Sequence, residues 1–435
     1  MPTEDAIRTA LAQIIDPDLN QDIISLGFLK TCDIRDGHVA IELELTTPAC
    51  PVRDMFRDRA QELISSLPGV ASVQVRLSSR KVERSLRAEQ SGLDAVDSLI
   101  AVASGKGGVG KSTVAASLAL ELSREGHRVG LLDMDIFGPS IPTLFEHHEP
   151  GLEGNANNQV LPMDFGGLKV MSFGFWLGDT PAIMRGPMVT NYVQQFLHQV
   201  AWGELDYLFL DLPPGTGDVQ ITITQSAQID GALIVTTPHV LSAADVGKAI
   251  RMFDKVNVPV LGVIENMSYF VAPDTGNQYR IFGEGAGQRI AERYGVPVLA
   301  QIPISATHFG GPTLRNERSS HVASAVDAAV RQLGRSRAGM MHPEILSDAH
   351  AVTLQWPDGT IDRVPNTDLR AACGCAVCVD EFTGEPKLDP STIPPDIKAN
   401  ALDRVGNYAV SVEWSDGHTT GFFPYDRIRQ LARRA

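Results

Sequence analysis

Gly105-Lys106-Gly107-Gly108-Val109-Gly110-Lys111-Ser112-Thr113 forms a glycine-rich loop in this chain of 435 residues. An apolar run at residues 99–103 precedes the loop, and a segment with helical spacing follows it. Two phosphate-binding patterns share these glycines. Gly-x-Gly-x-x-Gly is typical of dinucleotide sites, and Gly-x-x-x-x-Gly-Lys-Ser is the P-loop of nucleoside triphosphate sites. Both patterns predict a strand, a tight loop and a helix.

Lys111 and Ser112 favour the triphosphate. Asp133 or Asp135, about 20 residues farther on, also fits a dinucleotide site, so the glycines alone leave both ligands open. A triphosphate, however, requires a cation on its β- and γ-phosphates and a hydroxyl group for its Mg²⁺ ion. Backbone N–H groups of a glycine-rich loop converge on the phosphates. We therefore predict an ATP site with Ser112 as a Mg²⁺ ligand; its residues are Gly105, Lys106, Gly107, Gly108, Val109, Gly110, Lys111, Ser112 and Thr113.

Short apolar runs alternate with helical segments over residues 98–338. Further runs lie at residues 129–132, 207–210, 232–235 and 260–264. Continuous apolar runs separated by helices indicate parallel strands covered on both faces. We predict an α/β fold, with a P-loop NTPase domain built on a mostly parallel sheet. Asp211 ends one run and is expected on the Mg²⁺ side of the site, and the following loop, residues 213–218, suits the sensing of a γ-phosphate.

Two smaller domains are predicted on either side of this core. Residues 1–80 show two helical patterns and alternating strand patterns, which indicate a small α/β domain. Residues 81–97 are charged and are predicted to be a linker. Residues 345–435 are predicted to be β-rich, because residues 352–359 and 410–417 are similar strands that each end in an Asp-Gly turn.

The charge and hydropathy of the chain narrow its possible environments. The net charge is −15, from 52 acidic and 37 basic residues, which argues against a protein that coats nucleic acid. No apolar run is long enough to span a bilayer, and the acidic start of the chain does not resemble a signal peptide. We expect a cytoplasmic protein with no nucleic-acid partner and no stable membrane insertion.

Lys106, directly after the first glycine of the loop, resembles the second lysine of the deviant Walker A ATPases, the class that contains MinD, the nitrogenase iron protein and the Mrp proteins. In that class this lysine reaches the nucleotide of a partner subunit. The resemblance implies a homodimer with Lys106 and Lys111 as catalytic residues. A solvated loop lysine is the alternative.

A closer resemblance is to the Mrp/ApbC-type iron–sulfur carriers. It rests on residues 105–113, on Asp133-Met134-Asp135-Ile136-Phe137-Gly138-Pro139-Ser140, on residues 211–218, and on Ile264-Glu265-Asn266-Met267-Ser268. The resemblance implies that Asp135 orients the attacking water, that Asp211 serves Mg²⁺ through water, and that Asn266 contacts adenine. A turn residue at the end of a strand is the alternative for Asn266.

Three of the five cysteines form the cluster Cys373-Gly374-Cys375-Ala376-Val377-Cys378. Thiolates at this spacing suit an iron–sulfur cluster or zinc. We predict that Cys373, Cys375 and Cys378 hold a cluster, most simply [4Fe–4S]. A structural zinc ion with His350 or His418 as fourth ligand stays open. The surrounding segment resembles the N-terminal domain of γ-butyrobetaine hydroxylase-like proteins, which is associated with zinc.

Cys50 lies in Thr46-Thr47-Pro48-Ala49-Cys50-Pro51, between a predicted strand and a predicted helix. A thiol near a helix N-terminus has a lowered pKa, so we predict a reactive thiol that helps in cluster transfer. A buried structural cysteine is the alternative. This segment and Asp16-Pro17-Asp18 resemble the small domain of iron–sulfur assembly factors.

The chain departs from the carrier family after Asn266. The family carries a Cys-x-x-Cys pair there that bridges a dimer through a [4Fe–4S] cluster, whereas this chain has Ala272 and Thr275. The order of the three domains is similar to that of the chloroplast scaffold for photosystem I clusters and its bacterial counterparts. The resemblance implies an ATPase that receives a cluster from upstream assembly proteins and transfers it to apoproteins. The alternatives are a MinD/ParA-like positioning ATPase and a zinc-containing, nucleotide-sensing adaptor.

Overall fold

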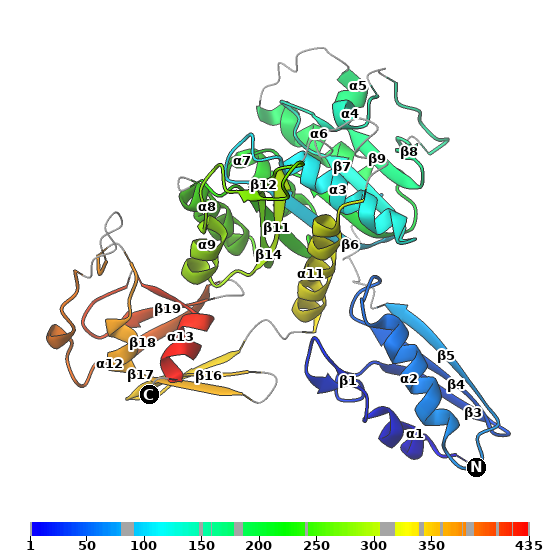
Figure 1. The fold of residues 1–435 in the computed structure, drawn as a ribbon, viewed down its shortest axis with the longest axis horizontal. Helices are drawn as coiled ribbons and strands as arrows, with labels where there is room; N and C mark the ends of the chain where they lie inside the picture. Colours follow the sequence, from blue (N-terminus) through cyan, green and yellow to red (C-terminus); the bar gives the residue numbers. More distant parts are fainter. Residues whose placement is uncertain are drawn as a thin grey trace.

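The computed structural model describes residues 2–79, 91–147, 151–157, 159–177, 186–239, 242–304, 318–338, 343–356, 360–375, 377–379, 387–405, 409–419 and 421–433. These residues form three lobes (Figure 1), namely an N-terminal lobe in blue, a large central lobe from cyan to yellow and a C-terminal lobe in orange and red. The predicted α/β class with a mostly parallel central sheet is confirmed.

The central lobe is built on a nine-stranded sheet, with strand order β13-β12-β11-β6-β10-β7-β9-β8 and with β14 paired to β12. Only the pairings of β8 and β13 are antiparallel. The strands are β6 Val96–Ala103, β7 Val129–Asp133, β8 Met163–Phe165, β9 Leu168–Ser172, β10 Leu205–Asp211, β11 Gly231–Thr236, β12 Val260–Val271, β13 Gln278–Tyr279 and β14 Val298–Ile304. The five apolar runs singled out in the sequence are β6, β7, β10, β11 and β12.

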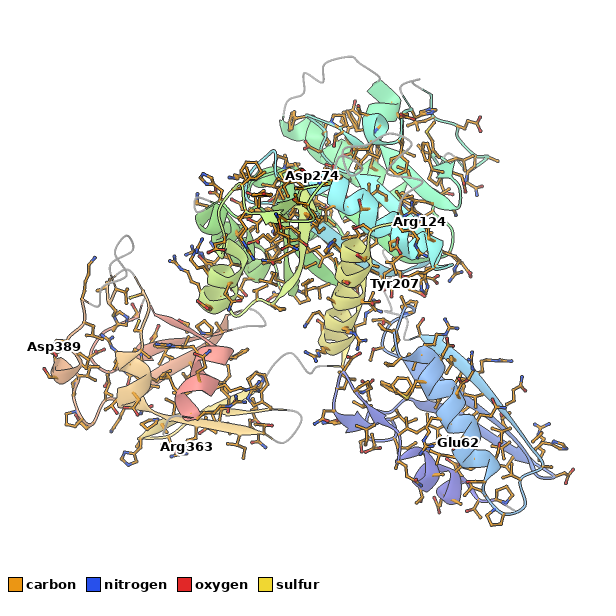
Figure 2. The ribbon with its side chains drawn as sticks, viewed as in Figure 1. Glu62, Arg124, Tyr207, Asp274, Arg363 and Asp389 are labelled. Atoms are coloured by element: carbon orange, nitrogen blue, oxygen red, sulfur yellow. The ribbon has the colours of Figure 1, made fainter. Side chains whose placement is uncertain are left out.

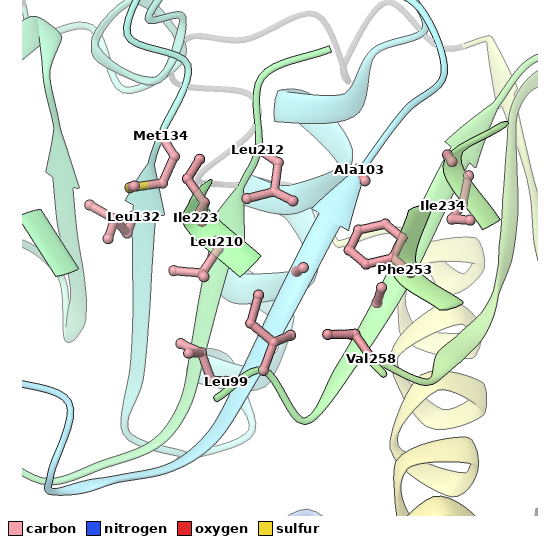
Figure 3. Close-up of a cluster of buried hydrophobic side chains, with 14 of the residues drawn as sticks. Leu99, Ala103, Leu132, Met134, Leu210, Leu212, Ile223, Ile234, Phe253 and Val258 are labelled. Carbon is pink, nitrogen blue, oxygen red and sulfur yellow. The ribbon is translucent and has the colours of Figure 1, made fainter. Parts of the chain in front are cut away.

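Helices cover both faces of this sheet, which is why its central strands are apolar on both sides. The helices of this lobe are α3 Lys111–Arg124, α4 Ile141–Leu144, α5 Gly174–Leu177, α6 Gly186–His198, α7 Asp218–Ser226, α8 Ser242–Lys255, α9 Ala286–Tyr294 and α11 Ser320–Arg337. Helices α3 and α11 pack on one face, and α6 to α9 pack on the other. Figure 3 shows Leu99 on β6, Leu210 on β10 and Leu132 on β7 among the apolar side chains of the second face.

The N-terminal lobe packs two helices on a three-stranded sheet of order β3-β4-β5. Its elements are α1 Glu4–Leu11, β1 Ile15–Asp16, β2 Gln21–Asp22, β3 Leu29–Arg35, β4 His38–Leu45, α2 Arg53–Ser65 and β5 Ser72–Ser79. The apolar pairs Ala6-Ile7, Ala10-Leu11 and Ile14-Ile15 recur at helical spacing and predict a helix up to Ile15, but the first helix ends at Leu11. Strand β3 was not predicted, because its side chains are mostly polar and none of them is fully buried.

The C-terminal lobe contains two antiparallel three-stranded sheets, each followed by a helix. Its elements are β15 Glu344–Ser347, β16 Ala351–Gln355, β17 Ile361–Pro365, α12 Asn366–Ala371, the 3₁₀ turn Pro390–Thr392, β18 Ala399–Val405, β19 Ala409–Trp414, β20 Phe422–Pro424 and α13 Tyr425–Ala432. The two similar sequence segments are β16 and β19. Gly417 takes φ +84° in the turn after β19, whereas the turn at Asp358-Gly359 lies outside the described residues.

Most of the predicted linker also lies outside the described residues, and β6 begins at Val96. Among the helices that the structure describes, none combines the length and the apolar character needed to cross a bilayer.

Candidate nucleotide and metal sites

The glycine-rich loop connects the end of β6 to the start of α3. Gly108 and Gly110 take φ +78° and +80°, a conformation that side chains disfavour. Gly105 has a different reason to be glycine, because an added Cβ would lie 2.5 Å from the backbone carbon of Asp245 in α8. Lys106 is half-exposed at the start of the loop, and its carbonyl accepts a hydrogen bond from the Ser104 hydroxyl (2.9 Å). Val109 is buried.

Lys111 is bound to the carboxylate that the sequence placed on the Mg²⁺ side. Its Nζ lies 2.5 Å from Oδ1 of Asp211, and the two side chains are only 6% and 0% exposed. Ser112 Oγ lies 3.4 Å from the same ammonium group. The second carboxylate oxygen of Asp211 is buried and has no hydrogen-bond partner among the described residues. A buried carboxylate oxygen without a hydrogen-bond partner, in a site that also contains the Ser112 hydroxyl, fits a Mg²⁺ ion with its water ligands.

Asp133 is a second buried carboxyl group, at the end of the neighbouring strand β7. Its oxygens accept hydrogen bonds from the backbone of Asp135 (3.0 Å) and Ile141 (3.2 Å) and from the hydroxyl of Ser172 (2.9 Å). Burial raises the pKa of Asp133 to about 7, and the charge of Asp211 adds to this effect while Lys111 opposes it. Asp133 thus anchors the loop that carries Asp135. Neither Asp133 nor Ser172 was among the predicted site residues.

Asp135, the predicted water-orienting residue, is half-buried near the same charges. Burial raises its pKa, Lys111 lowers it, and Asp211 raises it. The structure therefore brings Asp135, Asp211 and Lys111 into one electrostatic cluster at the carboxyl ends of parallel strands, where α/β proteins bind ligands.

The loop after β10 is tied to the glycine-rich loop by its backbone. The Gly215 N–H donates to the Ser104 carbonyl (2.9 Å). Gln220, a buried side chain that the sequence did not single out, donates to the Pro213 carbonyl. These contacts fix the loop that was expected to sense the γ-phosphate. The side chain of Asp218 lies outside the described part of the structure.

Asn266 lies against the glycine-rich loop. Its amide Nδ2 donates to the Val109 carbonyl (2.9 Å), and the same amide occupies the space where a Cβ of Gly110 would be. The adjacent Glu265 is fully buried and accepts hydrogen bonds from Ser268 Oγ, Gly287 N and Gln301 Nε2 at 2.7 to 2.9 Å. Asn266 thus holds the glycine-rich loop through the Val109 carbonyl. Its contact with adenine stays a prediction.

The clustered cysteines converge with one histidine in the C-terminal lobe. Sγ of Cys373, Cys375 and Cys378 and a ring nitrogen of His418 all lie within 4.8 Å of one another. His418 Nε2 is 3.4, 3.5 and 3.9 Å from the three sulfurs. Tetrahedral Zn–S bonds of about 2.3 Å and Zn–N bonds of about 2.0 Å would separate such atoms by roughly 3.5–3.8 Å. The donor set therefore fits one tetrahedral ion, and His350, the other candidate ligand, is not part of it.

Local packing holds these ligands in place. Arg370 Nη1 lies 3.4 Å from Cys378 Sγ, and Arg370 Nε donates to Asp416 (2.9 Å), which also caps the backbone of His418. Burial and the charge of Arg370 lower the pKa of His418, which favours the neutral ring that binds metals. A Cβ on Gly421 would lie 2.6 Å from Cys373 Sγ, so only glycine leaves room there.

Cys50 differs from its predicted state. It precedes α2 as expected, but burial raises the pKa of its thiol to about 11, and the charges of Asp16 and Asp18 add to this effect. The prediction of a lowered pKa was wrong because desolvation outweighs the helix N-terminus. The raised pKa keeps this half-buried thiol protonated at neutral pH in this arrangement of the lobes.

Ala272 and Thr275, which replace the family's cysteine pair, lie in the loop between β12 and β13 that Asp274 marks in Figure 2. Ala272 is buried and its N–H donates to the Asn277 carbonyl (2.9 Å), whereas Thr275 is exposed. Neither side chain offers a thiolate, so this loop cannot hold a cluster by the family's ligands.

Three family models match the chain in succession. Residues 4–75 match the iron–sulfur cluster assembly protein model, residues 95–333 the NUBPL iron-transfer P-loop NTPase model, and residues 344–429 the γ-butyrobetaine hydroxylase-like N-terminal model. These matches confirm the resemblances inferred from the sequence.

Two relatives and one solved structure extend the comparison. The chloroplastic Fe-S cluster assembly factor HCF101 of Oryza sativa is 40% identical over 98% of this chain and 82% of that protein. The iron-sulfur cluster carrier protein of Deinococcus radiodurans is 41% identical over 79% of this chain and 97% of that protein. A nucleotide-binding protein from Archaeoglobus fulgidus, solved with ADP, is 40% identical over 56% of this chain and 89% of that one, with a TM-score of 0.45. The chain belongs to the NUBPL iron-transfer P-loop NTPase family.

Proposed function

We propose that this protein is an ATP-dependent carrier that holds an iron–sulfur cluster and transfers it to apoproteins. The observation that carries the proposal is the presence, in one chain, of a P-loop with its buried Lys111–Asp211 pair and of a partly buried group of three cysteines and one histidine. Relatives that match most of the chain are named as iron–sulfur assembly factors and carriers, and soft thiolates are the ligands that such clusters prefer.

ATP hydrolysis serves as the switch in this proposal. Binding of ATP moves Lys111 from Asp211 to the β- and γ-phosphates, and frees the Asp211 carboxylate and the Ser112 hydroxyl to hold Mg²⁺. The ion, when bound, neutralises charge on the phosphates. Asp135 orients a water whose oxygen bonds to the γ-phosphorus as the bond to ADP breaks, and the water's proton leaves with the phosphate. The loop at residues 213–218 then loses its contact with the γ-phosphate.

The switch works in a homodimer in which Lys106 reaches the nucleotide of the second subunit. Two features support this part of the proposal, namely the position of Lys106 at the half-exposed start of the loop and the resemblance of Lys106 to the second lysine of the deviant Walker A ATPases. Upstream assembly proteins supply the cluster, and apo iron–sulfur proteins receive it.

The cluster is held by Cys373, Cys375 and Cys378, with Cys50 as a transfer thiol. A [4Fe–4S] cluster takes one thiolate on each of several irons, so these sulfurs have to spread apart from their described spacing before it binds. His418 is free to be replaced by a ligand from the acceptor.

The spacing of the four ligand atoms favours a second candidate function. Because Cys373, Cys375, Cys378 and His418 already fit a single tetrahedral ion, the C-terminal lobe would hold zinc and the protein would be a nucleotide-sensing adaptor. In that case the lobe depends on zinc for its fold, and any cargo has to bind elsewhere.

Metal analysis of protein purified and reconstituted without oxygen separates the two candidates. The carrier proposal predicts iron and acid-labile sulfide in near-equal amounts, visible absorbance, and the loss of both in the triple alanine variant at positions 373, 375 and 378. Cys32→Ala, which removes a thiol outside this group, serves as control. Stoichiometric zinc without sulfide, or cluster loading unchanged in the triple variant, would refute the ligand assignment.

A further inference from the structure

The last two turns of α11 lie on the face of the N-terminal lobe that contains Cys50. Arg331 forms an ion pair with the Asp18 carboxylate, and Arg335 Nε donates to the Asp18 carbonyl (3.0 Å). Arg337 Nη1 donates to the Thr46 carbonyl (3.2 Å). Three arginines on one helix thus bind the two loops that flank the thiol.

Gly334 allows the helix to approach this closely. It is buried inside α11, where glycine is a poor helix former, and its backbone is in the ordinary helical region. A Cβ added there would lie 2.9 Å from Thr46 Oγ1. The contact with the N-terminal lobe therefore explains why position 334 is glycine, since any larger side chain would push the lobe away.

Cys50 lies beside this contact and is half-buried. The space beside its thiol is lined by Asp16, Thr46, Arg331 and Gly334 and has a volume of about 10 Å³, room for roughly one water molecule. Neither a cluster nor the thiol of another protein can enter it. The raised pKa of the thiol agrees with this enclosure.

The end of α11 and the N-terminal lobe also form hydrogen bonds with the sheet that carries the nucleotide site. The side chain of Arg337 is 7% exposed, and its guanidinium group donates to the Asp97 carbonyl (2.8 Å) and to Ser98 Oγ (3.0 Å) at the start of β6. The hydroxyl of Tyr207 on β10 accepts a hydrogen bond from the Ala49 N–H (2.9 Å). Figure 2 places Tyr207 on the side of the central lobe nearest the N-terminal lobe. The opposite ends of β6 and β10 lead to the P-loop and to Asp211.

We infer that α11 is a cover for Cys50, and that the N-terminal lobe has to leave α11 before this thiol can receive or pass on a cluster. The arrangement described here is the closed one, held by the Arg331–Asp18 ion pair and by the close approach at Gly334. The covering of Cys50 by α11 is a property of the fold. Only its consequence for cluster transfer rests on the proposed role of Cys50 as a transfer thiol.

The test is the rate at which iodoacetamide alkylates Cys50 in the full-length protein, followed by mass spectrometry with Cys32 as internal reference. Gly334→Leu should raise the rate at Cys50 at least about tenfold, because alkylation requires an accessible thiolate, and should leave Cys32 unchanged. Ser324→Leu, at an exposed position of the same helix, is the matched control and should change neither rate. Equal rates at Cys50 in Gly334→Leu and wild type would overturn the inference.

A charge exchange keeps the test informative if Gly334→Leu does not fold. Arg331→Asp should open the cover and accelerate alkylation, and the double variant Arg331→Asp/Asp18→Arg should restore slow alkylation. Failure of the double variant to restore slow alkylation would contradict the role of the Arg331–Asp18 ion pair in holding the closed arrangement. Cluster transfer is measured separately in Cys50→Ser. Unchanged transfer in this variant would refute the proposed transfer role of Cys50, but it would not affect the inference that α11 covers the thiol.

Discussion

The ammonium group of Lys111 lies 2.5 Å from a carboxylate oxygen of Asp211, and both side chains are buried. A buried pair is costly to break unless a new partner compensates each charge. The phosphates of ATP compensate Lys111, and a hydrated Mg²⁺ ion compensates Asp211. In this view Lys111 and Asp211 compensate each other's charge until ATP and Mg²⁺ bind. Lys111, Ser112 and Asp211 could be predicted from the sequence because motif spacing and strand ends position them.

Ser172 could not be predicted as a site residue in this way, whereas Asp133 ends the apolar run at residues 129–132 as Asp211 ends its own run. Ser172 lies on β9, and nothing in the local sequence shows that this strand pairs with β7 and places Ser172 opposite Asp133. Only the register of the sheet brings the hydroxyl to the carboxylate. Residues that act through such a pairing carry no motif of their own.

Ser172→Ala should slow ATP hydrolysis roughly tenfold in kcat, since a hydrogen bond to a charged group that positions the reacting loop is lost. The KM for ATP should change little, because Ser172 does not belong to the phosphate loop. Steady-state phosphate release measures both constants. Ser226→Ala is the matched control, because Ser226 is also buried and makes two hydrogen bonds, at the far end of α7. Equal kcat values in the two variants would exclude the positioning role.

The pH dependence of Cys50 alkylation follows from its raised pKa. Burial holds the thiol protonated up to a pKa of about 11, so alkylation in wild type should still rise steeply above pH 9. In Gly334→Leu the thiol is solvated and its pKa returns toward the ordinary value of about 8.5, so the rate should level off at lower pH. A wild-type profile that levels off below pH 9 would show that the thiol is not buried in solution.

At the level of helices and strands, apolar periodicity predicted the central sheet because β6, β7, β10, β11 and β12 are buried on both faces. It failed for β3, whose side chains are largely polar, and for the end of α1, where the chain turns before Ile15. The C-terminal repeat was visible as two Asp-Gly segments. His418 could be proposed as a ligand from its residue type, but the choice between His418 and His350 required the fold of β19 and β20.

His418→Ala should weaken metal binding by the C-terminal lobe at least about 100-fold, because one of four ligands is lost and metal binding is coupled to folding. His350→Ala, at an exposed position outside the ligand group, is the matched control. Titration with Zn²⁺ or Co²⁺ and the melting temperature with and without chelator measure the effect. Equal metal affinity in the two variants would remove His418 from the site.

At the level of the whole molecule, three family domains meet in one chain, and contacts link them. Arg337 joins the N-terminal lobe to the start of β6, and β20 of the C-terminal lobe lies against α9 of the central lobe. Both outer lobes thus rest on elements of the nucleotide-binding sheet. The order of the domains was visible in the sequence, but their contacts were not, because they depend on side chains far apart in the chain.

A mixing experiment tests whether Lys106 acts on the nucleotide of a second subunit. Lys106→Ala and Asp135→Ala should each be inactive as ATPases. In a mixture of equal amounts, half of the dimers are mixed and each has one complete site, so about a quarter of the wild-type rate should return. No recovery after subunit exchange would mean that Lys106 acts within its own subunit or not at all.

The transfer of a cluster to an apoprotein, followed with and without ATP, tests the proposed function most directly. Reconstituted protein is mixed without oxygen with an apo [4Fe–4S] enzyme, and the recovered activity of that enzyme is measured over time. We predict transfer that depends on Cys373, Cys375 and Cys378 and changes in rate with ATP in wild type but not in Lys111→Ala. Transfer at the same rate with and without ATP, or no transfer from the reconstituted protein, would contradict an ATP-dependent iron–sulfur carrier.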